Sequence, residues 1–325
     1  MKAIVISEYG APEQLKIEER QTPNPESGQV LIKVKAFGIN RAETYMRQGA
    51  WGEVAEITGI ECVGTVELDT TGRLVAGTKV VAIMGGMGRT INGSYAEYTC
   101  LPASNVVAIN ADIPWDILAA IPESYATAWA CLHDNMKLKP GDSVLVRGGT
   151  SALGQAAINI AANTKEVSVI ASTRSRDCVE MLKGIGATSV LFETDDMSSD
   201  LRTLFPRGVD SVLDIIGNST LLDSLKMVKP GGYVCNAGFL GGGDPLSFNP
   251  LSDLPCSVNL NFFASFMFGT DGFPLSNIPV GEIVDKVVSG AYVAAPKKVF
   301  EFEQIVDAHR LMESNTTKGK IVIKL

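Results

Sequence analysis

The chain has 325 residues, of which 46% are hydrophobic, and its formal net charge is −8. This length and composition suit two ordinary domains with sizeable cores, which excludes an intrinsically disordered protein. The acidic balance argues against nucleic acid or an anionic membrane as a general partner, although a local basic pocket remains compatible with it.

The cysteines and the apolar runs bear on the compartment. The six cysteines are far apart and form no CxxC pair, which favours reduced thiols over a disulfide framework. No apolar run approaches the ~18 residues of a membrane span. The opening stretch MKAIVISEYGAPEQLKI has the character of a strand and a turn rather than of a signal peptide. We therefore expect a cytoplasmic protein.

The first third of the chain is rich in short β-prone runs that are separated by Gly, Pro and Asn. These runs are KAIVI at 2–6, VLIKVKAFGI at 30–39, CVGTVEL at 62–68, KVVAIM at 79–84 and SYAEYTCL at 94–101. Such runs favour strands joined by turns. We predict a β-rich domain whose first part covers residues 1–121.

The middle of the chain alternates short apolar runs with helical periods. In order they are VLVRG, ALGQAAINIAAN, VSVIAS, CVEMLKGIG, TSVLF, VDSVLDIIG, STLLDSLKMVK, GGYVCNAG and VNLNFFASF. The alternation predicts parallel strands with crossover helices, and hence a doubly wound α/β sheet over residues 122–268. Residues 269–325 then hold helices near 280–289 and 303–313 and a last strand, GKIVIKL, which we expect to return to the first domain.

The stretch VLVRGGTSALGQAAINIA has the order of strand, Gly-rich turn and helix that a dinucleotide fold requires. Backbone N–H groups at such a helix N-terminus hold a pyrophosphate, helped by the helix dipole. Ser151 stands at the middle glycine of the usual GxGxxG, and its hydroxyl is a candidate phosphate donor. The residues expected at the pyrophosphate are Gly149, Thr150, Ser151, Ala152 and Leu153. The alternative is a tight turn that binds nothing.

The end of the next strand bears on the choice of nucleotide. In this fold an Asp or Glu about 20 residues past the glycines binds the ribose 2′-hydroxyl. Here the strand VSVIAS leads instead into Thr173, Arg174, Ser175 and Arg176. Arginines and hydroxyl groups suit a 2′-phosphate, which a carboxylate would repel. We predict NADPH, with Arg174 as the better candidate contact; the alternative is two solvated arginines at a helix start.

Several motifs carry a resemblance to a known family. INRAETYMRQG at 39–49 matches an N-x-x-(D/E)-T-Y-x-R-x-G signature, and GSYAEYTCLP, LKPGDSVLVRGGTSALG, KGIGATSVLF, MVKPGGYVCNAGF and KGKIVIKL follow in family order. Along nearly its whole length the chain resembles the medium-chain dehydrogenase/reductase superfamily, and within it the zinc-independent quinone oxidoreductase (zeta-crystallin-like) branch. The resemblance implies a GroES-like catalytic domain, an inserted Rossmann domain, NADPH, reduction of quinones or α,β-unsaturated carbonyls, and a homodimer.

The sequence departs from the zinc enzymes of that superfamily. Their Gly-His-Glu ligand motif reads Gly59-Ile60-Glu61 here, and Cys62 follows. The chain has two histidines, at positions 133 and 309, both far from this place in the sequence. A catalytic zinc needs three converging protein ligands. We therefore predict no metal, and without a Lewis acid a conjugated carbonyl is the easier substrate.

The resemblance implies that Asn40 and Tyr45 lie at the domain cleft beside the nicotinamide. We predict Tyr45 as the donor to the substrate oxygen, Asn40 as a positioning residue that also contacts the cofactor, and Arg47 as a fixed charge. The alternatives are a packing role for Tyr45 and a loop-holding ion pair for Arg47. Two roles stay open for Arg41, recognition of an acidic substrate and capping of the rim of the cleft, and the sequence favours neither.

Further cofactor contacts are expected outside the carboxyl ends of the parallel strands. By position or by resemblance they are Thr127, Phe192, Gly217, Ala237, Gly238, Phe239, Phe266 and Phe268. A core role is the alternative for the phenylalanines, and we expect it for at least one of Phe266 and Phe268. We also expect the sixth strand to end at Phe266–Phe268 and to offer an edge for a dimer.

Two other functions remain open at this point. One is an enoyl-thioester reductase. Such an enzyme would need a basic channel for a carrier protein or coenzyme A, and the acidic composition does not indicate one. The other is a protein that binds NADPH without useful catalysis, such as a lens-type crystallin, an RNA-binding relative or a redox sensor. The low isoelectric point, about 5.0, argues against RNA.

Overall fold

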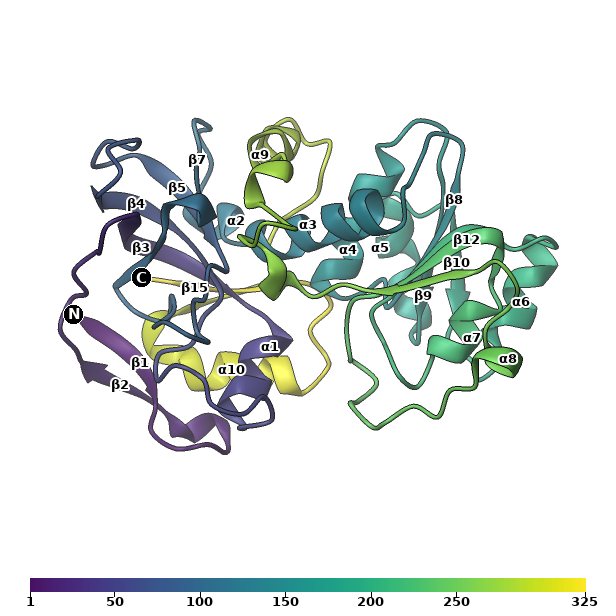
Figure 1. Ribbon diagram of the computed structural model, residues 1–325, viewed down its shortest axis with the longest axis horizontal. Helices are drawn as coiled ribbons and strands as arrows, with labels where there is room; N and C mark the ends of the chain where they lie inside the picture. Colours follow the sequence, from purple (N-terminus) through teal and green to yellow (C-terminus); the bar gives the residue numbers. More distant parts are fainter. The chain divides into compact units, whose positions relative to one another are not determined.

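The computed structural model describes all residues, 1–325, and Figure 1 shows its elements. The chain divides into two compact units. The β-rich unit comprises Met1–Ala126, Ser265–Gly290 and Ala294–Leu325, and the α/β unit comprises Thr127–Ala264 and Ala291–Val293. The chain thus enters the α/β unit a few residues after the expected boundary at 121 and leaves it shortly before the expected boundary at 268.

The β-rich unit contains two sheets. Its strands are β1 (Lys2–Ile6), β2 (Leu15–Glu19), β3 (Gln29–Ile39), β4 (Glu61–Asp69), β5 (Lys79–Ile83), β6 (Tyr98–Pro102), β7 (Val106–Ala108), β14 (Lys298–Glu301) and β15 (Ile321–Lys324). β1 pairs with β2, and the larger sheet has the order β14-β15-β3-β4-β5-β7, with β6 paired to β3. β15 runs antiparallel to β3, which confirms that the last strand returns to the first domain.

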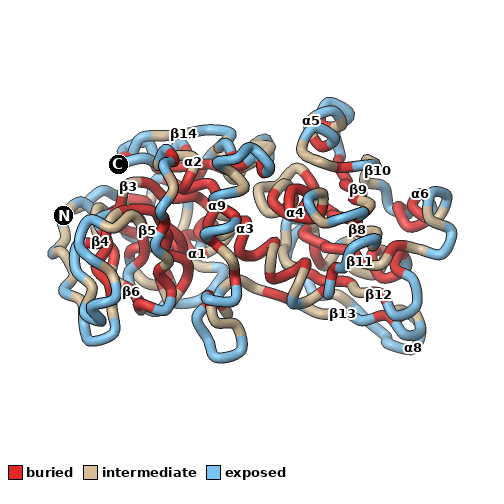
Figure 2. Tube along the Cα trace, turned by 90° about the horizontal axis from the view of Figure 1, so that it is seen from above, coloured by how far each residue is buried: buried red, intermediate tan, exposed pale blue.

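Alternating apolar residues of these strands form the core of the β-rich unit, and Figure 2 shows the buried tube along β3, β4 and β5. Val30, Ile32 and Val34 of β3 all point into this core, as the two-residue period of a strand requires. The helices of the unit are α1 (Arg41–Arg47), α2 (Trp115–Leu118), α9 (Val280–Val288) and α10 (Ile305–Glu313), and α3 (Pro122–Trp129) contains the boundary between the units.

The α/β unit is built on one parallel sheet. Its strands are β8 (Ser143–Arg147), β9 (Ser168–Thr173), β10 (Ser189–Phe192), β11 (Val209–Asp214), β12 (Val228–Asn236) and β13 (Asn259–Phe262). They lie in the order β10-β9-β8-β11-β12-β13, and every pair is parallel. This order confirms the doubly wound sheet. The connection reverses direction between β8 and β11, and ligands of such sheets bind beside that point.

Helices cover both faces of this sheet. They are a π-helix at Ala130–Asn135 and α4 (Ala152–Ala162), α5 (Val179–Gly184), α6 (Met197–Leu204), α7 (Leu221–Leu225) and α8 (Pro250–Asp253). Met197 and Leu201 of α6 and Leu225 of α7 share one core with the sheet, while α4 and α5 lie on the other side (Figure 1). The sequence pattern did not predict α6.

The prediction for the end of the sixth strand was wrong. β13 ends at Phe262, and Ser265–Met267 forms a 3₁₀ helix that belongs to the β-rich unit. The N–H of Phe268 donates to the Ser265 carbonyl at 3.0 Å, and the Phe268 carbonyl accepts from the Asn105 side chain at 3.1 Å. These bonds turn the apolar run away from the extended conformation that its composition suggested.

Candidate functional site

The Gly-rich turn joins β8 to α4. Gly148 has a φ of +90°, which favours glycine, and a side chain at Gly154 would overlap the Gly148 carbonyl. These glycines let the helix approach the strand closely. The N–H groups of Ala152 and Leu153 open α4 and have no partner one turn earlier within the helix, so the turn fits a bound pyrophosphate.

Ser151 acts as the N-cap of α4. Its Oγ accepts from the Gly154 N–H at 3.0 Å and donates to the Gly148 carbonyl at 2.9 Å. The hydroxyl proton is therefore used within the turn, which corrects the expectation that it is offered to a phosphate. The backbone of Ser151 is extended, with φ −71° and ψ 163°, so the position does not require a glycine for its conformation.

The end of β9 carries the predicted nucleotide-selecting residues. Thr173 is buried, and its hydroxyl is held in the turn, where it accepts from the Ser175 N–H at 3.1 Å. Arg174 and Arg176 are exposed, and neither forms an ion pair with an acidic side chain of the protein. The Arg176 guanidinium lies 4.9 Å from the centre of the Phe192 ring at the end of β10. Two cations and an aromatic face thus gather at this edge of the sheet.

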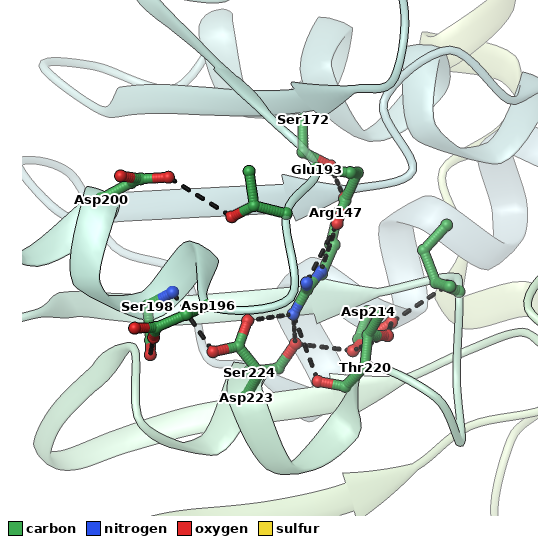
Figure 3. A network of polar contacts seen from close by, with 12 residues as sticks. Arg147, Ser172, Glu193, Asp196, Ser198, Asp200, Asp214, Thr220, Asp223 and Ser224 are labelled. Atoms are coloured by element: carbon green, nitrogen blue, oxygen red, sulfur yellow. Dashed lines mark hydrogen bonds and ion pairs between the residues drawn. The ribbon is translucent and has the colours of Figure 1, made fainter.

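Arg147, the last residue of β8, lies beneath this edge in a buried ionic network (Figure 3). Its guanidinium pairs with Glu193 at 3.0 Å and with Asp223 at 2.9 Å, and it donates to the Ser224 hydroxyl at 3.1 Å. The arginine is 1% exposed. A buried guanidinium in contact with two carboxylates satisfies most of its donors and leaves neither acid unpaired.

The network reaches the Gly-rich turn through Ser172. The Gly148 N–H donates to Ser172 Oγ at 3.0 Å, and that hydroxyl donates to Glu193 (Figure 3). Glu193 is the acid nearest in sequence to the end of β10, and Arg147 pairs with it. The arrangement therefore ties the turn to β9 and β10 and offsets part of the negative charge near the edge where the arginines lie.

The ends of β11 and β12 are held close together. Buried Asp214 accepts the N–H groups of Ile216 and Gly217 at 2.9 Å, and burial raises the pKa of this carboxyl. Gly217 has a φ of +94°, and a side chain there would overlap the Gly238 carbonyl. Gly217, Ala237, Gly238 and Phe239 thus lie at the carboxyl end of the sheet, as predicted from their sequence positions; their contact with a cofactor stays a prediction.

The predicted catalytic residues all belong to α1 or its N-cap. Tyr45 is partly buried, and its ring centre lies 5.9 Å from that of Trp51. Arg47 is fully buried, pairs with Glu313 of α10 and donates to the Gly10 carbonyl. This geometry agrees with the loop-holding alternative for Arg47 and offers no atom of it to a substrate.

Asn40 has both ends of its side-chain amide engaged inside the β-rich unit. Its Nδ2 donates to Glu61 at 2.9 Å, and its Oδ1 accepts from Lys320 Nζ at 2.5 Å. It also begins α1 in a capping box with Glu43. The positioning role predicted for Asn40 is therefore one that acts through this buried cluster, and its direct contact with the cofactor stays a prediction.

Glu43, Glu61 and Lys320 form that cluster with Asn40. Lys320 Nζ lies 2.5 Å from Glu61, whose second oxygen accepts the Glu123 N–H at 2.7 Å. Both glutamates are 0% exposed. Burial, reinforced by the Glu61 carboxylate, raises the pKa of Glu43 to about 8. At neutral pH Glu43 therefore keeps its proton, and the ion pair of the cluster is the one between Glu61 and Lys320.

These residues do not fit a catalytic zinc. Glu61 is already neutralised by Lys320, and burial raises the pKa of the neighbouring Cys62 thiol, which disfavours the thiolate that zinc needs. His309 is hydrogen-bonded to Tyr95 at 3.0 Å. No group of three or more His, Cys, Asp or Glu side chains is placed to hold a metal ion.

The remaining predicted residues fall in different environments. Thr127 is 3% exposed on α3, and Phe239 lies with its ring 5.8 Å from that of Phe262. Phe268 is 2% exposed, which makes it the expected core phenylalanine, whereas Phe266 is 47% exposed. The Phe266 ring lies 4.7 Å from the Arg89 guanidinium.

Sequence reasoning missed the two ionic clusters. Arg147 stands inside a strand pattern, and Lys320 directly precedes the last strand, so neither has a local motif that predicts burial. The one available signal was Asn40-x-x-Glu43, which is a capping-box pattern. That pattern predicts the helix start and says nothing about Glu61 or Lys320, which come from distant parts of the chain.

A GroES-like β-rich unit with an inserted Rossmann unit defines a class of dehydrogenases and reductases, and the comparisons agree. Residues 26–111 match the family model described as alcohol dehydrogenase GroES-like domain, and residues 185–323 match that of zinc-binding dehydrogenase. The chain is 27% identical to a quinone oxidoreductase of Lama guanicoe over 340 residues, which covers 100% of this chain and 98% of the relative.

Two further similarities extend this result. A homolog of the synaptic vesicle membrane protein VAT-1 from Rattus norvegicus is 26% identical over 99% of this chain and 84% of its own length. A mycobacterial protein solved in complex with NADPH superposes with a TM-score of 0.89 at 28% identity, and the match covers 100% of both chains. The chain belongs to the medium-chain dehydrogenase/reductase superfamily. None of its helices is long and apolar enough to cross a membrane.

Proposed function

We propose that the protein is an NADPH-dependent oxidoreductase that transfers hydride to quinones or α,β-unsaturated carbonyls without a metal. The observation that carries the proposal is the end of β9, where Arg174 and Arg176 lie without an acidic partner beyond a Gly-rich βα turn. The coarser part, an oxidoreductase with a nicotinamide cofactor, is supported by the superfamily, by the quinone oxidoreductase relative and by the NADPH complex of the mycobacterial neighbour.

The preference for NADPH over NADH rests on charge at that edge. A 2′-phosphate gains charge-assisted hydrogen bonds from an arginine fork, whereas NADH offers only a hydroxyl there. Glu193 would oppose a phosphate if it were free, but it is held by Arg147 and accepts the Ser172 hydroxyl, which weakens that repulsion. The exposed Arg176 guanidinium and the half-buried Phe192 ring also suit stacking beside an adenine ring.

Hydride transfer requires little of the protein beyond placing the cofactor and the acceptor. When bound, NADPH supplies the hydride, and negative charge then develops on the oxygen of the acceptor. Tyr45 is the proposed donor to that oxygen, and Asn40 holds the start of α1 on the Glu61–Lys320 pair. Arg47 supports the other end of α1 through Glu313. Much of the rate enhancement is expected from bringing the two reactants together.

The first experiment is a fluorescence titration with NADPH and with NADH. Wild-type protein is expected to bind NADPH at least about tenfold more tightly, and Arg174→Ala and Arg176→Ala are expected to reduce that preference. Arg207→Ala is the matched control, because Arg207 is an exposed arginine that precedes the amino end of β11. Equal binding of NADH would refute the NADPH assignment, and binding of neither nucleotide would refute the enzyme.

Activity separates the proposal from its alternatives. NADPH oxidation with a simple quinone or enal supports the oxidoreductase, and Tyr45→Phe is expected to lower kcat by about tenfold or more if the phenol donates to the oxygen. Turnover of enoyl thioesters alone would favour the enoyl-thioester reductase. Tight NADPH binding without turnover of any acceptor would favour the non-catalytic alternative.

We also propose a homodimer that forms through β13. This strand is at the edge of the sheet, and its Leu260 and Phe262 are 38% and 54% exposed. Unpaired edge strands with apolar side chains favour pairing with a second copy. Light scattering is expected to give the mass of a dimer, and Phe262→Asp is expected to shift it toward the monomer. A monomeric wild-type protein would refute this assembly.

A further inference from the structure

Arg89 is a half-buried cation of the β-rich unit that has no acidic partner in the protein. Its guanidinium carbon lies 5.2 Å from the centre of the Trp51 ring and 4.7 Å from that of Phe266. The Trp51 ring in turn lies 5.9 Å from that of Tyr45. Tyr45, Trp51, Arg89 and Phe266, here called the Arg89 cluster, all belong to the β-rich unit.

The other arginines of this unit all have polar partners. Arg47, Arg20 and Arg310 pair with acids, while Arg41 donates to the Asn315 side chain and Arg73 to the Ala103 carbonyl. The guanidinium of Arg89, by contrast, meets only the two aromatic rings. In a chain of net charge −8, a half-buried guanidinium with neither a carboxylate nor a hydrogen-bond acceptor from the protein is unexpected on charge balance alone.

The backbone holds Arg89 in one place. The N–H groups of Arg89, Thr90 and Ile91 all donate to the Gly86 carbonyl, at 3.1, 2.9 and 3.1 Å. Gly88 has a φ of +72° and its N–H donates to the Ile91 carbonyl at 2.9 Å. A side chain at Gly88 would lie 3.0 Å from the Gly59 nitrogen. The turn is therefore tight, packed against its neighbours and suited to present a fixed side chain.

The aromatic members of the cluster are held as well, yet they remain accessible. Trp51 is 39% exposed and Phe266 is 47% exposed. The segment after Phe266 is anchored by Asn105, whose side chain donates to the Phe268 carbonyl at 3.1 Å. The cluster thus combines exposed aromatic faces with an unpaired positive charge on an ordered backbone.

The chemistry of a guanidinium indicates what would bind. Its N–H donors lie in its plane, so a ring that covers its face leaves the donors at its edge available. Those donors match the two oxygens of a carboxylate in a bidentate pair. The neighbouring aromatic rings favour a flat apolar or conjugated body. A neutral aliphatic acceptor would satisfy neither preference.

We propose that the Arg89 cluster selects planar conjugated acceptors that carry a carboxylate, and that the Arg89 guanidinium binds this carboxylate. This inference rests on the proposed function in one respect, because it takes the face beside Tyr45 as the acceptor site. It adds a substrate class: aromatic or quinonoid carboxylates in preference to neutral quinones.

A binding experiment tests the subsite without any turnover. Calorimetric titration compares 2-naphthoate with its methyl ester, on wild-type protein and on Arg89→Gln and Arg89→Lys. The wild type is expected to bind the carboxylate about tenfold more tightly than the ester, Arg89→Gln to bind both equally, and Arg89→Lys to fall between them. Arg20→Gln, which removes the same charge from the surface of the same unit, is expected to keep the wild-type preference.

Each outcome of that titration decides the proposal. Equal binding of acid and ester by the wild type would overturn it, and so would a preference that survives in Arg89→Gln. Loss of the preference in Arg20→Gln would show a net-charge effect and would also overturn it. Circular dichroism melts of each variant check that the fold is retained, and Arg89→Lys serves where Arg89→Gln does not fold.

Kinetics then distinguish this inference from the proposed function. With a carboxylate-bearing naphthoquinone, Arg89→Gln is expected to raise KM about tenfold more than it raises the KM of the neutral naphthoquinone. An equal fall of kcat with both quinones would mean that Arg89 serves the developing oxyanion, which would overturn the selective role. If the wild type reduces neither quinone but still prefers 2-naphthoate, the proposed function fails and the subsite stands.

Discussion

The two units of the protein each bury an ionic cluster, and the clusters differ in how their charges are matched. In the α/β unit, the Arg147 guanidinium meets Glu193, Asp223 and the Ser224 hydroxyl. In the β-rich unit, Lys320 meets Glu61 and the Asn40 amide, while Glu43 lies in the same interior without a cation of its own.

The difference follows from the donors that each cation supplies. A guanidinium has five N–H donors in a planar fork, whereas an ammonium has three on a compact centre. Arg147 can therefore pair two acids that lie on different elements. Lys320 pairs one, and the second carboxyl of its cluster stays protonated because burial raises its pKa. Within these two clusters, each acid is thus either ion-paired or protonated.

The largest effect is expected from removing the arginine. Arg147→Met would leave Glu193 and Asp223 without a cation at side-chain exposures of 14% and 15%. Breaking one side of a buried pair costs about 3–5 kcal/mol, so the free energy of unfolding in urea is expected to fall by about that amount. The Gly-rich turn loses its support through Ser172 as well, and NADPH affinity is expected to fall with it.

Two further variants help to interpret the stability of Arg147→Met. Arg174→Met, at an exposed arginine of the same unit, is expected to change the free energy of unfolding by less than about 0.5 kcal/mol. Adding Glu193→Gln to Arg147→Met is expected to recover part of the loss, since one unpaired charge is then gone. A loss below about 1 kcal/mol in Arg147→Met would show that both acids reach solvent, and the comparison of the clusters would fail.

The second effect depends on pH and concerns Glu43. Its pKa is about 8 in the folded protein and 4.5 in an unperturbed chain. Between these values the Glu43 carboxyl is ionised in the unfolded state and protonated in the folded state. Its contribution therefore lowers the free energy of unfolding progressively as pH rises. Glu43→Gln removes the cost and keeps an acceptor for the Asn40 N–H. The free energy of unfolding of Glu43→Gln, relative to wild type, is expected to rise by about 1.4 kcal/mol per pH unit between the two pKa values.

Urea titrations at several pH values measure this slope. Both proteins carry the same other titratable side chains, so the difference between their stabilities isolates the Glu43 carboxyl. Glu53→Gln is the control, because Glu53 is exposed and forms no ion pair, and its difference from wild type is expected to stay flat. A flat difference for Glu43→Gln would mean that Glu43 is already ionised at low pH.

The smallest effect is expected at the Gly-rich turn itself. Ser151→Ala removes the acceptor of the Gly154 N–H, and loss of such a cap costs about 1 kcal/mol. Ser151→Thr keeps the cap and is expected to be close to wild type. Because the hydroxyl is used within the turn, neither change is expected to alter the Kd for NADPH by more than about threefold. A loss of affinity much larger in Ser151→Ala than in Ser151→Thr would instead assign the hydroxyl to the phosphate.

Local pattern predicted most of the α/β unit. The runs VLVRG, VSVIAS and TSVLF became β8, β9 and β10 within one or two residues, and ALGQAAINIAAN became α4. The structure of each of these segments can be predicted from the segment alone, because strand and helix periods are local properties of the chain. The failure at Phe266–Phe268 has the opposite cause, since a bond from Asn105, far away in the sequence, stabilises the 3₁₀ turn there.

The candidate site divides in the same way. The Gly-rich turn and Arg174–Arg176 were predictable because strand order places the carboxyl ends of β8 and β9 side by side. The Arg147 network and the Glu43–Glu61–Lys320 cluster were not, because their members come from separate elements and share no spacing. Arg89 was missed for the same reason: its partners Trp51 and Phe266 lie far from it in the chain.

The amino-acid sequence by itself determined the α/β class, most of the succession of strands and helices along the α/β unit, the turn that fits a nucleotide and the absence of an acid at the end of β9. These depend on residue type and spacing within short windows. Only the tertiary structure decided which charges are neutral, paired or unpaired. The charge state of Glu43, the pairing of Arg147 and the exposure of Arg89 to a ligand all depend on burial and on neighbours from elsewhere in the chain, because desolvation and Coulomb forces act through space.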